Sequence, residues 1–113
     1  MQLSVQQKTA ANGVVVLELS GGIVSGRCTA LEEQVMALAA GGHTRVVMDV
    51  TGITFLDSAG VGTIVACLTK LKKAGGDLRI AGATGKAEAV LKMTQVDQVI
   101  RFFPTFEAAL ADF

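Results

Sequence analysis

The sequence predicts an α/β fold: a mixed, mostly parallel sheet of about five strands with four helices and an antiparallel N-terminal hairpin. The dipeptide Asn12-Gly13 indicates the hairpin, because both residues tolerate the positive φ angles of a tight turn. The nearly continuous apolar segment 45–50, RVVMDV, is typical of a strand buried on both faces of a parallel sheet. Helical and strand-like segments alternate after it, and strands joined through helices are expected to run parallel with right-handed crossovers.

The elements before this strand are the hairpin and one helix. Residues 2–8 are predicted to form a short, half-exposed strand, residues 14–19 a second strand, and residues 20–26, SGGIVSG, a loop. Apolar residues at helical spacing indicate the helix: Leu31, Val35 and Leu38, with Cys28 one turn earlier. The helix begins either at Thr29, which forms a capping-box pattern with Glu32, or at Ser25, and it ends at Gly41-Gly42.

The rest of the chain continues the alternation. The predicted elements are a helix at about 58–73, a strand at 77–82, a helix at about 85–95, a short strand at 98–102 and a last helix in 106–113. Gly75-Gly76 ends the first of these helices, and Pro104 with Thr105 opens the last. The order β-β-α-β-α-β-α-β-α fits a single domain over residues 1–113.

Composition excludes several classes of function. A formal net charge of zero gives no electrostatic support for a nucleic-acid or anionic-membrane surface. No apolar run approaches the roughly 18 residues of a spanning helix. The N-terminus also lacks a secretory signal pattern, so we expect a cytoplasmic protein without direct membrane insertion. His43 is the only histidine, and Cys28 and Cys67 fall in apolar helical patterns that favour buried, reduced thiols. We therefore expect no metal site and no catalytic site.

The segment 54–63, TFLDSAGVGT, holds the most informative residues. Asp57 and Ser58 fall where the second helix is expected to begin, and either side chain can accept a hydrogen bond from an amide of the first turn. Ser58 can also be a phosphoacceptor, because the added charge of about −1.5 to −2 is well tolerated at a helix N-terminus. The two roles are compatible, since an exposed capping serine can also be modified.

The second helix has an unusual number of small side chains. Its apolar stripe is predicted to face the sheet and consists of Val61, Ile64, Val65, Leu68 and Leu71. The opposite side is predicted to carry two rows of small residues: Ala59, Gly62, Ala66 and Thr69 in one, and Gly60, Thr63 and Cys67 in the other. Each glycine costs roughly 0.8–1.0 kcal/mol relative to Ala inside a helix, and less in the first turn. Either a glycine packs tightly on the preceding strand, or the helix end is a surface where another backbone docks.

The segment 47–82, VMDVTGITFLDSAGVGTIVACLTKLKKAGGDLRIAG, resembles the signature of bacterial anti-sigma factor antagonists of the STAS domain family. The shared pattern is a buried strand, an Asp-Ser-small-Gly-hydrophobic-Gly helix start, and a helix that ends in Gly-Gly before the next strand. The resemblance covers essentially the whole chain, including the segment 106–110, and is weakest before residue 25. It implies the STAS fold.

The resemblance also implies a partner switch rather than an enzyme. In the family, the unmodified antagonist binds an anti-sigma factor that is also a GHKL-type serine kinase, and this frees a sigma factor for RNA polymerase. The kinase phosphorylates the serine of the Asp-Ser motif, here Ser58, which breaks the complex, and a metal-dependent serine phosphatase restores the antagonist. Nucleotide and magnesium belong to the kinase, so this chain is expected to hold no cofactor. The implied contact surface comprises Asp57, Ser58, Ala59, Gly60, Gly62 and Thr63, with Gly22 and Val24 in the loop at 21–26.

One position departs from the family pattern. Many members have Gly-x-Leu-Asp after the second strand, whereas this chain has GGIV at 21–24, so Val24 takes the place of the aspartate. Less negative charge is therefore expected around Ser58, and the partner is expected to be divergent. The alternative is a scaffold or an accessory subunit of a signalling or lipid-transport complex without sigma regulation. A hydrolase using Ser58 is disfavoured, because the only possible histidine base, His43, is predicted at the opposite edge of the sheet.

Overall fold

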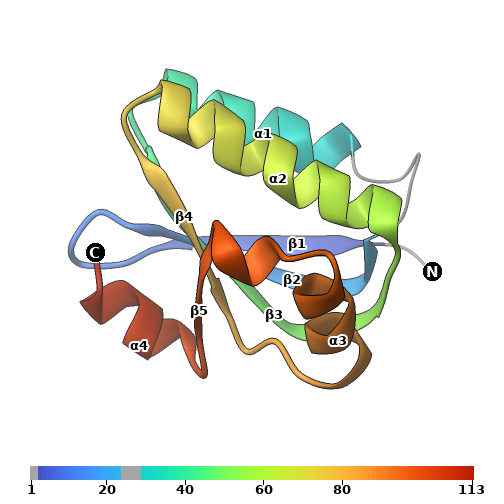
Figure 1. Cartoon of the computed structure of the whole chain (residues 1–113). Helices are drawn as coiled ribbons and strands as arrows, with labels where there is room; N and C mark the ends of the chain where they lie inside the picture. The colour runs from blue at the N-terminus through green and yellow to red at the C-terminus, as the bar shows by residue number, and fades with distance from the viewer. Residues whose placement is uncertain (1–2, 24–28) are drawn as a thin grey trace.

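The computed structural model describes residues 3–23 and 29–113. Its five-stranded sheet has the order β1-β2-β3-β4-β5, with β1 antiparallel to β2 and the other neighbours parallel. Strands β1 to β5 span Ser4–Thr9, Val15–Ile23, Arg45–Leu56, Asp77–Ala81 and Arg101–Phe103. Helices α1 to α4 span Thr29–Ala40, Ser58–Lys73, Gly85–Met93 and Phe106–Ala111, and a 3-10 helix, η1, spans Val96–Gln98. The predicted α/β fold, with its antiparallel N-terminal hairpin and four helices, is confirmed (Figure 1).

Helices pack on both faces of the sheet. Figure 1 shows α1 and α2 side by side on one face and α4 on the opposite side. The larger core cluster joins α1, α2 and α3 to the sheet and includes Leu17, Leu31, Met48, Ile64 and Leu91. The smaller cluster lies under α4 and consists of Val14, Val16, Val47, Ala81 and Ala109. Neighbouring strand residues enter different clusters because successive side chains point to opposite faces of a sheet.

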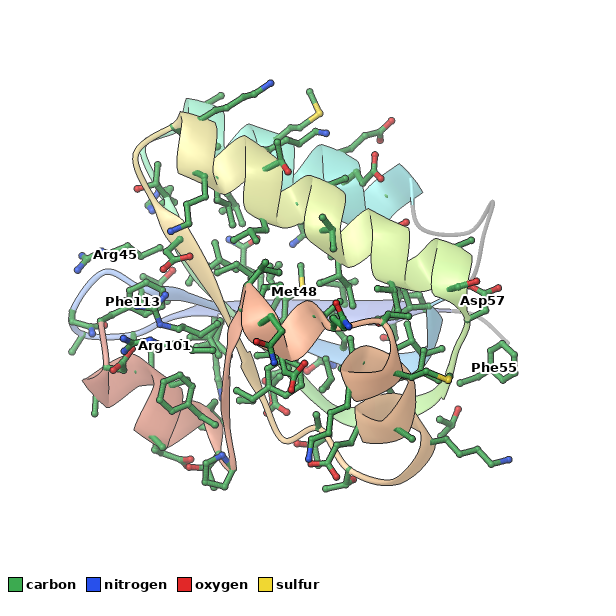
Figure 2. All side chains as sticks on the ribbon, in the orientation of Figure 1. Arg45, Met48, Phe55, Asp57, Arg101 and Phe113 are labelled. Carbon is green, nitrogen blue, oxygen red and sulfur yellow. The ribbon has the colours of Figure 1, made fainter. Side chains whose placement is uncertain are left out.

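The parallel strands give the sheet two distinct edges. β2 to β5 run in the same direction, so their carboxyl ends lie at one edge, here called the carboxyl edge, and their amino ends at the other, the amino edge. Ile23 and Leu56 pair in register at the carboxyl edge, where α2 begins directly after β3. Figure 2 shows Asp57 at this edge, with Arg45 and Arg101 at the other end of the molecule.

Two strands are longer than the sequence predicts. β2 continues through Gly21-Gly22 to Ile23, where a loop was the expectation, and β3 continues to Leu56. The pairing of these extensions contains register shifts, which are β-bulges or similar irregularities. Gly21 has φ of +92°, a conformation that glycine adopts without strain. The extension depends on pairing between distant segments, so local sequence patterns do not reveal it.

The other boundaries differ by smaller amounts. α1 begins at Thr29, one of the two predicted starts, whereas Ser25 and Cys28 lie outside the described residues. The helix predicted to reach residue 95 ends at Met93, and the strand predicted at 98–102 is β5 at 101–103. Between them, Gln95 adopts a left-handed conformation with φ of 64°, which stops α3 before η1 begins.

Candidate docking site at the start of helix α2

Asp57 caps the helix that begins at Ser58. The Asp57 carboxylate Oδ1 accepts a hydrogen bond from the Gly60 amide at 2.6 Å, and its backbone carbonyl accepts one from Val61 at 3.0 Å. Of the two possible N-caps, Asp57 is therefore the one that the structure uses. Ser58 is the first residue of α2 and is exposed. Its hydroxyl is not needed to begin the helix.

The two glycines of the first turns have different environments. Gly60 is buried, and a Cβ atom built there would lie 2.0 Å from the carbonyl oxygen of Ile23. Only glycine fits this contact, so the local explanation, tight packing on the preceding strand, accounts for Gly60. Gly62 is exposed, and a Cβ atom there would meet nothing within 4 Å. Packing inside the domain does not explain Gly62, which leaves the docking interpretation for this residue.

The exposed side of α2 differs from the predicted one at three positions. Gly60 and Cys67 are buried rather than on the outer face, which confirms the separate expectation of a buried Cys67 thiol. Val65 is 36% exposed rather than part of the inward stripe. Gly60 is buried against the Ile23 backbone, whereas Cys67 is buried because α1 lies beside α2 (Figure 1) and shares a core cluster with Cys67. The first predicted row is confirmed as accessible: Ala59, Gly62 and Thr69 are exposed and Ala66 is half-buried.

The outer surface of α2 carries no charge over its first three turns. The residues from Ser58 to Thr69 are all uncharged, and the first cation of the helix is Lys70. The nearest carboxylate, that of Asp57, already accepts the Gly60 amide. A charge added at Ser58 would therefore change the electrostatic character of an otherwise neutral surface.

The other predicted contact residues lie around this helix start. Thr63 is half-buried in α2, and Ala59 is exposed beside Ser58. Gly22 is buried in β2 and not in a loop, but it is at the carboxyl edge, because it pairs in register with Phe55 of β3. The end of β2 reaches the helix start through the Asp57 amide, which donates to the Ile23 carbonyl at 3.4 Å. Val24 lies outside the described residues.

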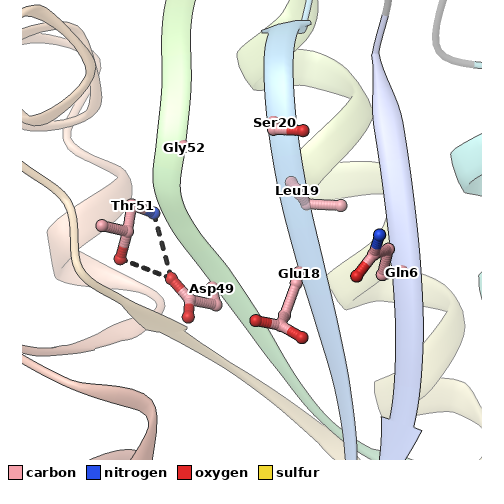
Figure 3. A pocket seen from close by; sticks show the side chains of 7 residues that line it. All are labelled: Gln6, Glu18, Leu19, Ser20, Asp49, Thr51 and Gly52. Carbon is pink, nitrogen blue, oxygen red and sulfur yellow. Dashed lines mark hydrogen bonds between the residues drawn. The ribbon is translucent and has the colours of Figure 1, made fainter.

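Sequence analysis did not single out two features of the surface. The first is Phe55, which is 42% exposed at the end of β3. The second is a cavity of about 250 Å³ on the sheet face that α4 leaves uncovered, lined by Gln6, Glu18, Leu19, Ser20, Asp49, Thr51 and Gly52 (Figure 3). Both depend on pairing across strands and have no local sequence signal.

The carboxylates of this cavity already have partners. Asp49 Oδ1 accepts from the Thr51 hydroxyl at 2.6 Å and from the Thr51 amide at 3.0 Å (Figure 3). Glu18 forms an ion pair with Lys8 at 3.5 Å. Both carboxylates of the cavity therefore have partners within the described residues.

The described residues do not bring Ser58 and the only histidine together, and they contain no cluster of metal-ligating side chains. Over residues 3–23 and 29–113, no group of three or more His, Cys, Asp or Glu side chains could hold a metal ion. His43 is exposed just before β3, at the amino edge, and therefore lies across the sheet from Ser58. Within the same residues, no helix combines the length and apolar character needed to cross a membrane.

The fold and the sequence together define a STAS domain. The sequence profile of the STAS domain family matches residues 6–109, so the chain belongs to this family. Its members of the anti-sigma antagonist type are typically non-catalytic. The family assignment that the 47–82 segment suggested is therefore confirmed.

Several anti-sigma factor antagonists are similar to this chain. The crystal structure of an antagonist from Mycobacterium paratuberculosis is 28% identical, with a TM-score of 0.86 over 98% of this chain and 93% of that one. A candidate antagonist from Thermotoga maritima has a TM-score of 0.87 at 20% identity, over 96% of this chain and 92% of that one. The antagonist SpoIIAA in its unphosphorylated form has a TM-score of 0.73 at 19% identity, over 96% of each chain. The last two likenesses show a common fold.

The direct sequence match to a relative is shorter. A candidate anti-sigma factor antagonist from Thermotoga maritima is 24% identical over 71 residues, which are 63% of this chain and 63% of that protein. The match therefore spans less than two thirds of the relative's length. Similarity to anti-sigma factor antagonists is established at low identity, and the partner and the switch are matters of proposal.

Proposed function

We propose that this chain is an anti-sigma factor antagonist: it binds an anti-sigma factor, releases a sigma factor, and is switched off by phosphorylation of Ser58. The proposal rests on the observation that Asp57 and Ser58 have different roles at the start of α2. Asp57 makes the capping hydrogen bond, and Ser58 is the exposed first residue beside it. A serine that is not needed as a cap can be modified without removing the interaction that begins the helix.

A phosphate at Ser58 would act on the surface more than on the fold. It adds about −1.5 to −2 charges, and the partial positive charge of a helix N-terminus favours an anion there. The same charge would stand beside Asp57, on a helix surface that is uncharged as far as Thr69. A partner that fits a neutral surface must then bury an unpaired charge, which costs affinity.

The partners follow from this proposal. A GHKL-type anti-sigma factor with serine kinase activity would bind the unmodified protein and phosphorylate Ser58, and a serine phosphatase would restore it. Nucleotide and magnesium would be held by the kinase, and this chain would act in the cytoplasm as a binding protein and not as an enzyme. The predicted contact residues fall on two surfaces that support such docking: exposed Ser58, Ala59 and Gly62 on α2, and the end of β2 next to them.

The proposal is tested with two substitutions of Ser58. The purified GHKL-type serine kinases of the source organism serve as probes, one at a time, with ADP in place of ATP so that no phosphate is transferred. Ser58→Ala should bind like the wild type, because a methyl group keeps the surface neutral. Ser58→Asp should weaken binding by at least about tenfold, because it adds a charge at the contact.

A matched charge variant controls for net charge alone. Gln98 is exposed just before β5, at the amino edge, and Gln98→Glu adds one negative charge with little change of shape. It should leave binding unchanged. Equal affinity of Ser58→Asp and wild type, or a kinase panel that binds neither, would reject the proposal. Stable, ATP-insensitive co-purification with several partners at fixed stoichiometry would instead favour the scaffold or transporter-subunit role.

A further inference from the structure

Phe55 is exposed beside the proposed docking site. All five phenylalanines of the chain are described, and the other four are partly buried, whereas Phe55 is 42% exposed. Figure 2 shows its ring pointing away from the body of the domain, at the end that also carries Asp57. An aromatic ring left in water forgoes a large gain from burial, so its exposure three residues before Ser58 needs a reason.

The irregular end of β3 directs this ring outward. Ile53 and Leu56 are buried in the main core, and the two residues between them, Thr54 and Phe55, are exposed. The in-register neighbour of Phe55 on β2 is Gly22, which has no side chain to cover the ring. At this pair of described residues, β2 therefore offers no in-register side chain that would pack on Phe55.

The surroundings of Phe55 favour an apolar complement. Thr54, Ser58 and Ala59 are exposed and uncharged. The carboxylate of Asp57 is directed to the Gly60 amide of the first helical turn. A phenyl ring beside these uncharged side chains is best complemented by an apolar pocket wide enough to hold it.

The geometry points to Phe55 as the aromatic anchor of the docking site: its ring inserts into an apolar pocket on the anti-sigma factor, next to the surface that receives Ser58. This inference rests on the proposed function and adds to it the residue that supplies affinity. Aromatic side chains in desolvated pockets dominate the energetics of many protein interfaces. Since Ser58 follows Phe55 by three residues, its phosphate would stand at the rim of the same pocket. Phosphorylation of Ser58 would then disturb the contact that contributes most to the binding affinity.

The test compares truncation of Phe55 with truncation of an exposed apolar residue at the other edge. Val99 is 59% exposed and precedes β5, so Val99→Ala is the control. Affinities for the GHKL-type serine kinase are measured with ADP by biolayer interferometry, for wild type, Phe55→Ala, Phe55→Leu, Val99→Ala and Ser58→Asp. Phe55→Ala should weaken binding at least about tenfold, Phe55→Leu by less, and Val99→Ala should have no effect. Because Phe55 is exposed, circular dichroism should show the same fold for all variants.

The outcomes separate this inference from the proposed function. If Phe55→Ala binds the kinase with wild-type affinity while Ser58→Asp binds it more weakly, Phe55 is not the anchor of the docking site. The proposed phosphorylation switch at Ser58 would then still stand. If the wild-type protein binds none of the kinases, both the anchor role of Phe55 and the proposed function are wrong. If Phe55→Ala abolishes self-association in sedimentation, or adsorption to lipid vesicles, while kinase binding is unchanged, then Phe55 serves a second copy or a membrane and the inference is wrong.

Discussion

The contrast between Gly60 and Gly62 gives the sharpest prediction, because the same substitution should have opposite effects two residues apart. In Gly60→Ala, the new methyl carbon would lie 2.0 Å from the carbonyl oxygen of Ile23 and 2.7 Å from its carbonyl carbon. These atoms belong to the backbone and cannot rotate away. Either β2 or the start of α2 must move. In Gly62→Ala, the methyl group meets nothing within 4 Å.

The magnitudes follow from two opposing terms. Overpacking costs about 1–3 kcal/mol, and a backbone clash this close belongs at the upper end, at about 3 kcal/mol. Alanine regains up to about 0.8–1.0 kcal/mol of helix propensity at either position. Gly60→Ala should therefore lose about 2 kcal/mol in the free energy of unfolding. Gly62→Ala should gain up to about 1 kcal/mol.

Thermal unfolding followed by far-UV circular dichroism measures both changes, and it suits a chain without Trp or Tyr. For a domain of this size, about 1 kcal/mol corresponds to a shift in Tm of about 4 °C. Gly60→Ala should melt about 8 °C below the wild type, and Gly62→Ala up to about 4 °C above it. A Gly60→Ala protein at least as stable as the wild type would refute the packing argument.

The same pair separates stability from binding. If Gly62 lets a partner approach the helix closely, Gly62→Ala should be more stable and yet bind the GHKL-type serine kinase more weakly. Unchanged affinity of this variant would show that the bare surface at Gly62 is not used for docking.

Two further predictions concern stability. Asp57→Ala removes the N-cap, so its free energy of unfolding in urea should be about 1 kcal/mol lower than that of the wild type. Asp57→Asn should keep most of the stability, because asparagine caps a helix as well as aspartate does. Equal losses in the two variants would contradict the capping role of Asp57. Acid should weaken the attachment of α4. The hydrogen bond from Arg79 holds the pKa of Asp112 below the ordinary value of an aspartate carboxyl, with Arg101 contributing in the same direction. A lowered folded-state pKa contributes stability above the pKa of the unfolded state, and this stability is lost as the pH falls through the folded-state pKa. The difference in Tm between wild type and Asp112→Asn should therefore shrink in acid, and a constant difference from neutral pH to below pH 3 would be contrary to this pairing.

The predictable part of the fold is what local patterns encode. The Asn12-Gly13 turn, the apolar run of β3 and the Gly-Gly helix end each depend on neighbouring residues, and the order of elements follows from them. The placement of Ser58 and Asp57 at the start of a helix was predictable for the same reason. Which of the two caps the helix was not, because both side chains can accept the same amide.

The unpredicted features depend on contacts between distant segments. β2 runs past Gly21-Gly22 because the end of β3 pairs with it, and this pairing exposes Phe55. The burial of Cys67 was predicted, but its place in the outward row was wrong, because α1 covers this flank of α2 and a helical periodicity alone cannot show that. Gly60 and Gly62 look equivalent in sequence, and only the position of the Ile23 carbonyl distinguishes them.

The state of Ser58 in the cell tests the central claim most directly. Intact-mass and peptide mass spectrometry would be applied to the protein purified from its own cells, with and without phosphatase treatment, during growth, starvation and stress. The account predicts a phosphatase-sensitive phosphate on Ser58 under at least one of these conditions. A chain that carries no phosphate on Ser58 under all of them would contradict the switch and favour a constitutive scaffold or transporter-subunit role.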